Sequence, residues 1–124
     1  LYHFVVENGY VYGVGTYSGW SSTQFIVMGA NFDPYDFNVK AQIQLDNEAI
    51  ENREGVLLVD GDRAYIGHDD GVWVLNVRFP NSPVVLPGIE DNDSGTLALE
   101  ATEENLYRLT RRGQIHVYEL DNLA

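Results

Sequence analysis

The sequence predicts an all-β chain made of about three four-stranded antiparallel sheets, the third of them incomplete. Short β-branched and aromatic runs are separated by glycine, asparagine, aspartate or proline along the 124 residues, which is typical of strands joined by tight turns. Helical patterns are nearly absent, because the mildly helical stretch from Asp46 to Glu54 has too few apolar residues to anchor a helix. An internal repeat further predicts that the strands come in similar groups.

The first two strands of each repeat are placed by three tyrosines, Tyr12, Tyr65 and Tyr107, which lie 53 and 42 residues apart. The residues eight, six and one positions before each tyrosine are apolar in every repeat: Phe4, Leu57 and Leu99; Val6, Val59 and Ala101; Val11, Ala64 and Leu106. Asn8-Gly9 and Asp60-Gly61 suit hairpin turns because both central positions can take positive φ. Each repeat is therefore expected to begin with two antiparallel strands.

A third strand follows each pair. In the second and third repeats it comes after a glycine six residues past the tyrosine, as "VWVLNV" (72–77) and "IHVYEL" (115–120). In the first repeat a longer loop, "TYSGWSST", precedes "FIVMGA" (25–30). The matching positions are Phe25, Val72 and Ile115; Val27, Val74 and Val117; Ala30, Val77 and Leu120. Trp73 alternates with two valines, so we expect it to point away from them and pack on a neighbouring sheet.

A fourth strand follows a proline-bearing turn in the first two repeats, within "NFDPYDFNVKAQIQL" and "RFPNSPVVLPGI". Pro34, Pro80 and Pro83 belong in the turn or at an edge, because proline cannot donate to a ladder. The third repeat reaches Ala124 before any fourth strand. The repeats thus cover about 1–46, 55–90 and 95–124, and four-stranded repeats of this length are the signature of β-propeller blades.

Blades of this kind stack on their neighbours, and closing a ring normally takes at least four of them. The chain supplies two blades and most of a third. We therefore expect either a segment that joins the remaining blades of a larger propeller, or a self-assembling unit in which a homodimer makes six blades.

The segment "VDGDRAYIGHDDGVWVLNVRFPNSPVV" resembles the LVIVD-type β-propeller repeat, and "ENLYRLTRRGQIHVYELDN" is similar to the same repeat and to its YVTN and WD-repeat relatives. The resemblance extends over nearly the whole chain. It departs from the family at the acid that usually ends the third strand: Asn76 and Gly29 replace it, whereas Glu119 keeps an acid. The resemblance implies a propeller and an extracellular or cell-surface location, and it implies no particular reaction.

The amino-acid composition limits the classes of partner that the chain is expected to bind. Nineteen acidic residues against seven lysines and arginines give a net charge of −12, which repels nucleic acid and anionic membrane surfaces. Cysteine is absent, so disulfides and thiolate metal sites are excluded. No apolar run approaches the roughly 20 residues of a membrane-spanning helix. A protein partner is therefore expected, with no nucleic acid and no membrane insertion.

The candidate binding residues lie in loops that a propeller brings to one face, where a rigid scaffold usually places binding groups. The face is expected to gather Tyr17, Trp20, Ser21 and Ser22 from the first repeat, His68, Asp69 and Asp70 from the second, and Arg111 and Arg112 from the third. In the long first loop an exposed tyrosine and tryptophan would stack on a sugar ring or anchor a protein. The alternative is that Trp20 folds back over its own sheet.

The ionisable candidates have simpler alternatives. His68 with its two aspartates would be a general base or a weak metal site, or only a solvated turn before Gly71. Arg111 and Arg112 would pair with a carboxylate of a neighbouring blade, or form a solvated turn. His3 and His116 fall in strands and are expected to be packing or surface residues rather than catalysts. "DNDSG" (91–95) begins like a calcium loop, but Thr102 stands where the bidentate glutamate is needed, which leaves only a looser calcium site as an alternative to a plain loop.

The predicted function is a non-catalytic propeller module that serves as a protein-interaction or structural scaffold, with no catalytic residue, no metal and no cofactor. One alternative is a carbohydrate-binding propeller, supported by Tyr17 and Trp20, although the other two repeats lack an equivalent aromatic pair. A further alternative is a fragment of a propeller enzyme whose catalytic residues lie on missing blades.

Overall fold

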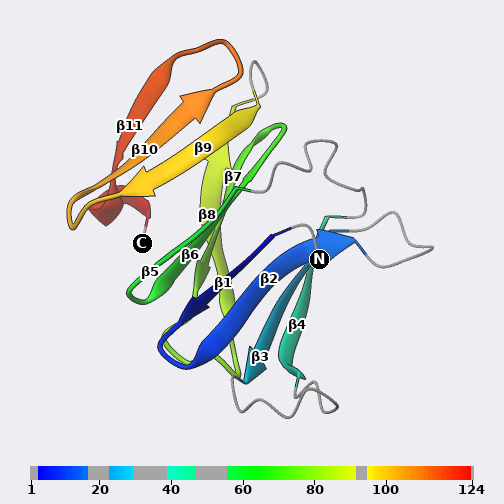
Figure 1. Cartoon of the computed structure of the whole chain (residues 1–124). Helices are drawn as coiled ribbons and strands as arrows, with labels where there is room; N and C mark the ends of the chain where they lie inside the picture. The colour runs from blue at the N-terminus through cyan, green and yellow to red at the C-terminus, as the bar shows by residue number, and fades with distance from the viewer. Residues whose placement is uncertain (1–2, 17–22, 30–38, 47–55, 92–94, 124) are drawn as a thin grey trace.

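The computed structural model describes residues 3–16, 23–29, 39–46, 56–91 and 95–123, and within them the chain is all-β. The described residues form eleven strands, β1 to β11, in three antiparallel sheets that follow one another along the chain. Figure 1 shows how they are arranged. The fold class predicted from the sequence is confirmed at this level. In the described part of the chain no helix is long and apolar enough to cross a membrane.

The first two sheets each have four strands, hydrogen-bonded in chain order. Sheet I consists of β1 (His3–Glu7), β2 (Tyr10–Thr16), β3 (Thr23–Gly29) and β4 (Val39–Asp46). Sheet II consists of β5 (Val56–Asp60), β6 (Arg63–His68), β7 (Gly71–Asn76) and β8 (Val84–Glu90). Pro87 lies inside β8, which its position at the outer edge of the sheet permits, since an edge strand does not need every N–H.

Sheet III has three strands in the described residues: β9 (Thr96–Ala101), β10 (Asn105–Thr110) and β11 (Ile115–Glu119). The strand predicted to run to residue 120 ends at Glu119, because Leu120 begins a short 3-10 helix, η1 (Leu120–Leu123). Arg63 of β6 donates to the Leu120 carbonyl oxygen at 2.8 Å and so ties η1 to sheet II.

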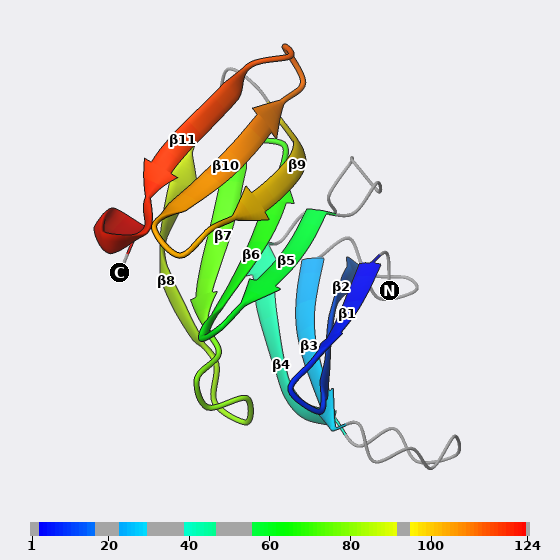
Figure 2. The ribbon, with the colours of Figure 1, turned by 60° about the vertical axis from the view of Figure 1, so that its left-hand side comes forward.

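The three sheets pack face to face, and Figure 2 shows them standing side by side. Their first strands are neighbours, with β1 against β5 and β5 against β9. One apolar core lies between sheets I and II and includes Tyr12, Phe25, Val27, Ile66 and Leu75. A second core lies between sheets II and III and includes Tyr65, Val72, Val74, Leu99 and Leu106. Strands β6 and β7 of sheet II thus have a core on each face, and they carry consecutive buried residues, whereas the edge strand β8 is mostly exposed.

The alternation of side chains places each apolar residue on one face or the other. Val72 and Val74 lie in the second core, whereas Trp73 packs against the first, as its position between two valines predicted. A register shift between Val72 and Val74 opposite β8 accompanies this arrangement. Gly88 lies against this shift, where a Cβ would collide with the Val72 carbonyl oxygen.

The hairpin turns confirm one sequence prediction and correct another. Asn8 and Gly9 both have positive φ, at 51° and 80°, as a two-residue type I′ turn requires. Asp60 instead ends β5 and pairs with Arg63, so the turn residues are Gly61 and Asp62. Only Gly61, with φ of 58°, is in the left-handed region. A turn with glycine at its first central position needs only that one positive φ, so the prediction that Asp60 also takes positive φ was wrong.

Candidate functional site

Three parts of the chain meet at one end of the sheets, which we call the loop end: the β6–β7 turn, the described ends of the link from β8 to β9 (Asp91 and Gly95), and the β10–β11 turn (Figure 1). They are joined to one another by hydrogen bonds. The Asp91 amide donates to the Asp70 carbonyl oxygen at 2.8 Å, and the Arg111 amide donates to the Gly95 carbonyl oxygen at 3.0 Å. The Arg111 guanidinium also bonds the Asp69 carboxylate at 2.7 Å. Sheets II and III are therefore locked together at this end.

The structure brings together the described residues that the sequence placed on one face. His68, Asp69 and Asp70 lie beside the turn that carries Arg111 and Arg112. The predicted pairing of these arginines with a neighbouring carboxylate is observed for Arg111, whereas Arg112 is exposed. The other predicted members of this face, Tyr17, Trp20, Ser21 and Ser22, lie outside the described residues.

His68 is positioned by two of its neighbours, Trp73 and Asp70. Its ring stacks on the Trp73 indole with centroids 4.0 Å apart and an interplanar angle of 22°. Its Nδ1 accepts a hydrogen bond from the Asp70 amide at 3.1 Å, so the neutral ring carries its proton on Nε2. Gly71 closes the turn with φ of 137°, where a Cβ would collide with the Ile89 carbonyl oxygen. The structure has a turn at Asp69 and Asp70 before Gly71, in which Asp70 is exposed while His68 and Asp69 are half-buried.

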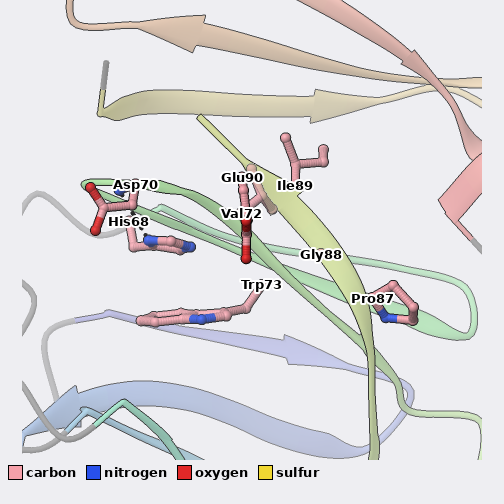
Figure 3. A pocket seen from close by; sticks show the side chains of 8 residues that line it. All are labelled: His68, Asp70, Val72, Trp73, Pro87, Gly88, Ile89 and Glu90. Carbon is pink, nitrogen blue, oxygen red and sulfur yellow. Dashed lines mark hydrogen bonds between the residues drawn. The ribbon is translucent and has the colours of Figure 1, made fainter. Parts of the chain in front are cut away.

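An open cleft of about 610 Å³ lies beside this histidine, and Figure 3 shows its lining. Its residues come from β6, β7, β8 and the β6–β7 turn: His68, Asp70, Val72, Trp73, Pro87, Gly88, Ile89 and Glu90. The Glu90 carboxylate points over the Trp73 side of the cleft, and Asp70 lies at its rim (Figure 3). An indole and a pyrrolidine ring beside carboxylates form a surface suited to a cationic or hydroxyl-rich group.

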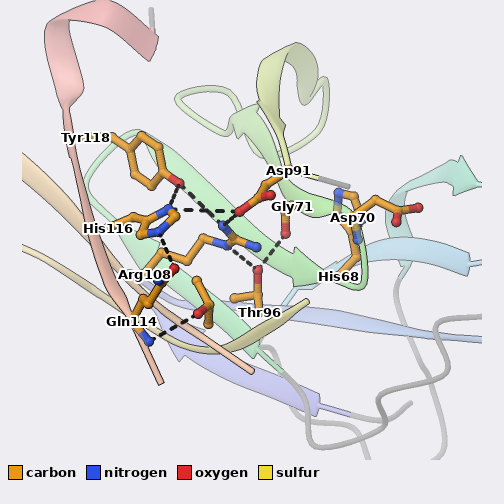
Figure 4. A network of polar contacts seen from close by, with 10 residues as sticks. His68, Asp70, Gly71, Asp91, Thr96, Arg108, Gln114, His116 and Tyr118 are labelled. Carbon is orange, nitrogen blue, oxygen red and sulfur yellow. Dashed lines mark hydrogen bonds and ion pairs between the residues drawn. The ribbon is translucent and has the colours of Figure 1, made fainter. Parts of the chain in front are cut away.

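A polar network, shown in Figure 4, lies between sheets II and III behind the loop end. Its centre is Arg108 of β10, whose side chain is 0% exposed. The guanidinium bonds the Asp91 carboxylate at 2.8 Å, and its Nε donates to the Thr96 hydroxyl at 2.7 Å. That hydroxyl donates in turn to the Gly71 carbonyl oxygen at 2.8 Å. The buried charge is thereby neutralised by a carboxylate that remains 20% exposed, and a chain of bonds crosses from sheet III to sheet II.

The network continues along β11. The Tyr118 hydroxyl lies 3.4 Å from both the Arg108 guanidinium and His116 Nδ1. His116 Nδ1 is 3.9 Å from the Asp91 carboxylate, and its Nε2 is 3.3 Å from the Gln114 side chain. His116 lies in a strand, as expected, and belongs to the structure between the sheets.

Arg108 is the central site residue that the sequence interpretation missed. The sequence did contain a signal for it. Arg108 directly follows Tyr107 and therefore aligns with Ile66 of the second repeat, which is buried. A charge at a buried position predicts a partner of opposite sign. That partner, Asp91, lies in a link between sheets, so its position could not be read from strand alternation.

Two close arginine–carboxylate pairs, Arg111–Asp69 and Arg108–Asp91, lie at or behind the loop end, and the described residues contain no cluster of three His, Asp or Glu side chains arranged to hold a metal ion. The pKa is raised for Tyr12 and Tyr65, in each case chiefly by burial, and both phenols lie in the sheet cores rather than at the loop end. No family model, curated protein or solved structure matches the chain.

Proposed function

We propose that this chain is a non-catalytic β-propeller module that serves as a scaffold and presents its loop end to a protein partner. The observation that carries this proposal is the rigid assembly of that end. Three connections from two sheets are joined there by backbone bonds and by the Arg111–Asp69 pair. A surface that is already ordered loses little conformational entropy on binding, which favours recognition by a folded scaffold.

The charge of the surface suggests the chemistry of its partner. Asp70 and Glu90 are exposed beside the Trp73 cleft, and the whole chain carries a net charge of −12. Such a surface attracts a basic segment of a protein and accelerates its encounter. An extracellular or cell-surface location, which the LVIVD resemblance implies, is part of the same proposal.

The proposal is tested by titrating the ¹⁵N-labelled chain with a lysine-rich peptide and, as a control, a glutamate-rich peptide. We expect chemical-shift changes around Asp70, Glu90 and the Trp73 indole with the basic peptide only. The variant Asp70→Asn/Glu90→Gln should weaken this binding several-fold, whereas Asp62→Asn, in the hairpin at the opposite end of β6, should not. Shifts spread over all acidic surfaces, or equal effects of the two variants, would show nonspecific attraction and contradict the proposal.

Two alternatives make different predictions in the same assays. Carbohydrate binding is favoured by the cleft with its indole, carboxylate and imidazole, although His68 covers part of the Trp73 ring. Neutral oligosaccharides would then shift the Trp73 indole signal where the basic peptide does not. An enzyme fragment would hydrolyse lactone or ester substrates in the presence of divalent metals. Loss of that activity on His68→Ala would replace the non-catalytic proposal.

A further inference from the structure

The outer face of sheet III, formed by Tyr107, Leu109, Ile115 and Val117, carries apolar side chains at positions that are buried in the other two sheets. Phe25 and Val72 are 0% and 1% exposed, and the matching Ile115 is 68% exposed. Val27 and Val74 are both 0% exposed, and the matching Val117 is 55% exposed. In sheets I and II these positions contact the next sheet along the chain.

The cross-strand register supports this correspondence. Tyr12 pairs with Val27 in sheet I, Tyr65 with Val74 in sheet II, and Tyr107 with Val117 in sheet III. The first two tyrosines are 3% and 1% exposed because the following sheet covers them. The third points to the outer face. Sheet III therefore repeats the surface that sheets I and II use to bind their neighbour, and in this chain that surface is uncovered.

The outer face of sheet I, formed by Phe4, Val6, Val11, Ile26 and Met28, is the opposite half of such a contact. Phe4 is 61% exposed, whereas the residues that match it, Leu57 and Leu99, are 7% and 8% exposed under the preceding sheet. Val6, the next residue on the same face, is 56% exposed. Sheet I thus exposes the face that, in sheets II and III, packs against the preceding sheet.

We propose that two copies of this chain associate head to tail, with the outer face of sheet I of one copy packed on the outer face of sheet III of the other. A second copy is the occupant because each chain carries both halves of the contact, and this contact is already made twice within the chain. The association is heterologous, so it closes into a ring or continues as an open stack. It uses the sheet faces and is independent of the function proposed for the loop end.

Charge sets the conditions of this association. Each copy carries a net charge of −12, so two copies repel one another at long range, and salt screens this repulsion. Apolar side chains form the centre of each face, and burying them is not weakened by salt. The sheet III face also carries two exposed glutamates, Glu100 opposite Tyr107 and Glu119 in β11. We therefore expect association to strengthen as the salt concentration rises, which is the opposite of an interface held by ion pairs.

The test measures mass by light scattering and sedimentation equilibrium for two variants, Phe4→Lys on sheet I and Ile115→Lys on sheet III. Either lysine adds a charge to an apolar interface, so each pure variant should associate at least about ten-fold more weakly than the original chain. A mixture of the two should regain a one-to-one complex of twice 13.9 kDa, because the mixture still contains one intact face of each kind. Phe79→Lys, a change of similar exposure in the β7–β8 turn, is the matched control and should associate normally.

Each other outcome would overturn the proposal. A chain that stays monomeric up to near-millimolar concentration at high salt does not use these faces for a second copy. Loss of association in Ile115→Lys alone indicates a symmetric interface, such as pairing of β11 with β11. Two variants that both lose association and do not recover it when mixed do not use the two faces as halves of one contact. Circular dichroism first confirms that the variants fold, and Val6→Lys and Val117→Lys replace either one that does not. Peptide binding at the loop end is measured separately on the monomeric variants, so failure of one proposal is distinguishable from failure of the other.

Discussion

Replacing Arg108 by methionine should destabilise the chain by about 3 kcal/mol, although the substitution preserves the length and most of the apolar volume of the side chain. Removing one member of a buried ion pair costs about 3–5 kcal/mol when the other charge stays buried. Asp91 keeps 20% of its side chain exposed, so water can partly hydrate the carboxylate left behind. The loss should therefore lie at the lower end of that range. Urea denaturation followed by circular dichroism measures it.

Removing the other member of the pair, Asp91, should destabilise the chain more than removing Arg108, because Asp91 is partly exposed and Arg108 is fully buried. Asp91→Ala leaves the Arg108 guanidinium at 0% exposure with its charge uncompensated, which we expect to cost about 4 kcal/mol. The double variant no longer holds a buried charge at this position. It should lose only about 4–5 kcal/mol, which corresponds to a coupling energy of about 2–3 kcal/mol between the two residues.

The same urea measurements include a control variant and a result that would contradict this reasoning. Arg112→Met, an exposed change in the β10–β11 turn, should alter the free energy of unfolding by less than about 0.5 kcal/mol. If Arg108→Met is as mild as this control, or if the double variant loses the full sum of the two single losses, the buried pair does not hold sheet III to sheet II.

Two further substitutions test the contacts between sheets. Burial raises the pKa of the Tyr65 phenol above its ordinary value of 10.0, and a hydrogen bond from Arg63 partly opposes this rise. The folded chain therefore keeps a proton that the unfolded chain loses above about pH 10. Stability should therefore fall as pH rises past 10, and Tyr65→Phe should make the fall in urea midpoint between pH 9 and 11 smaller; equal slopes would contradict this. Gly67→Ala should cost about 1–3 kcal/mol, because its Cβ would lie 2.6 Å from Thr96 Cγ2 and 2.8 Å from Val56 Cβ. An unchanged urea midpoint for that variant would mean that β9 does not press on Gly67 in solution.

Strand alternation carried most of the fold prediction. A period of two assigns each side chain to a face, and this placed Trp73 correctly on the face opposite to Val72 and Val74. The turn residues were harder to predict, because the overlapping dipeptides Asp60-Gly61 and Gly61-Asp62 suit different turn types. In "DGDR" the pairing shifts by one residue, so that Gly61 rather than Asp60 takes the first central position.

The loop end could be predicted only in part. Sequence order and strand direction predict which turns share an end, and this brought Asp69 near Arg111. The links across sheets depend on how far one sheet is rotated on the next, which no local pattern records. For this reason the bonds that join Asp91, Thr96 and Arg108 appeared only in the structure.

Head-to-tail association would also determine how the loop ends are arranged. Sheets II and III present their loop connections on the same side, and the relation between them is the one that a second copy would repeat. The loop ends of two associated copies would therefore point in the same direction and form one continuous acidic surface. A symmetric interface does not require the two loop ends to point in the same direction, because a two-fold axis can turn the second loop end away. A partner with two basic segments would bind the head-to-tail pair more tightly than a single copy, since the second contact becomes intramolecular.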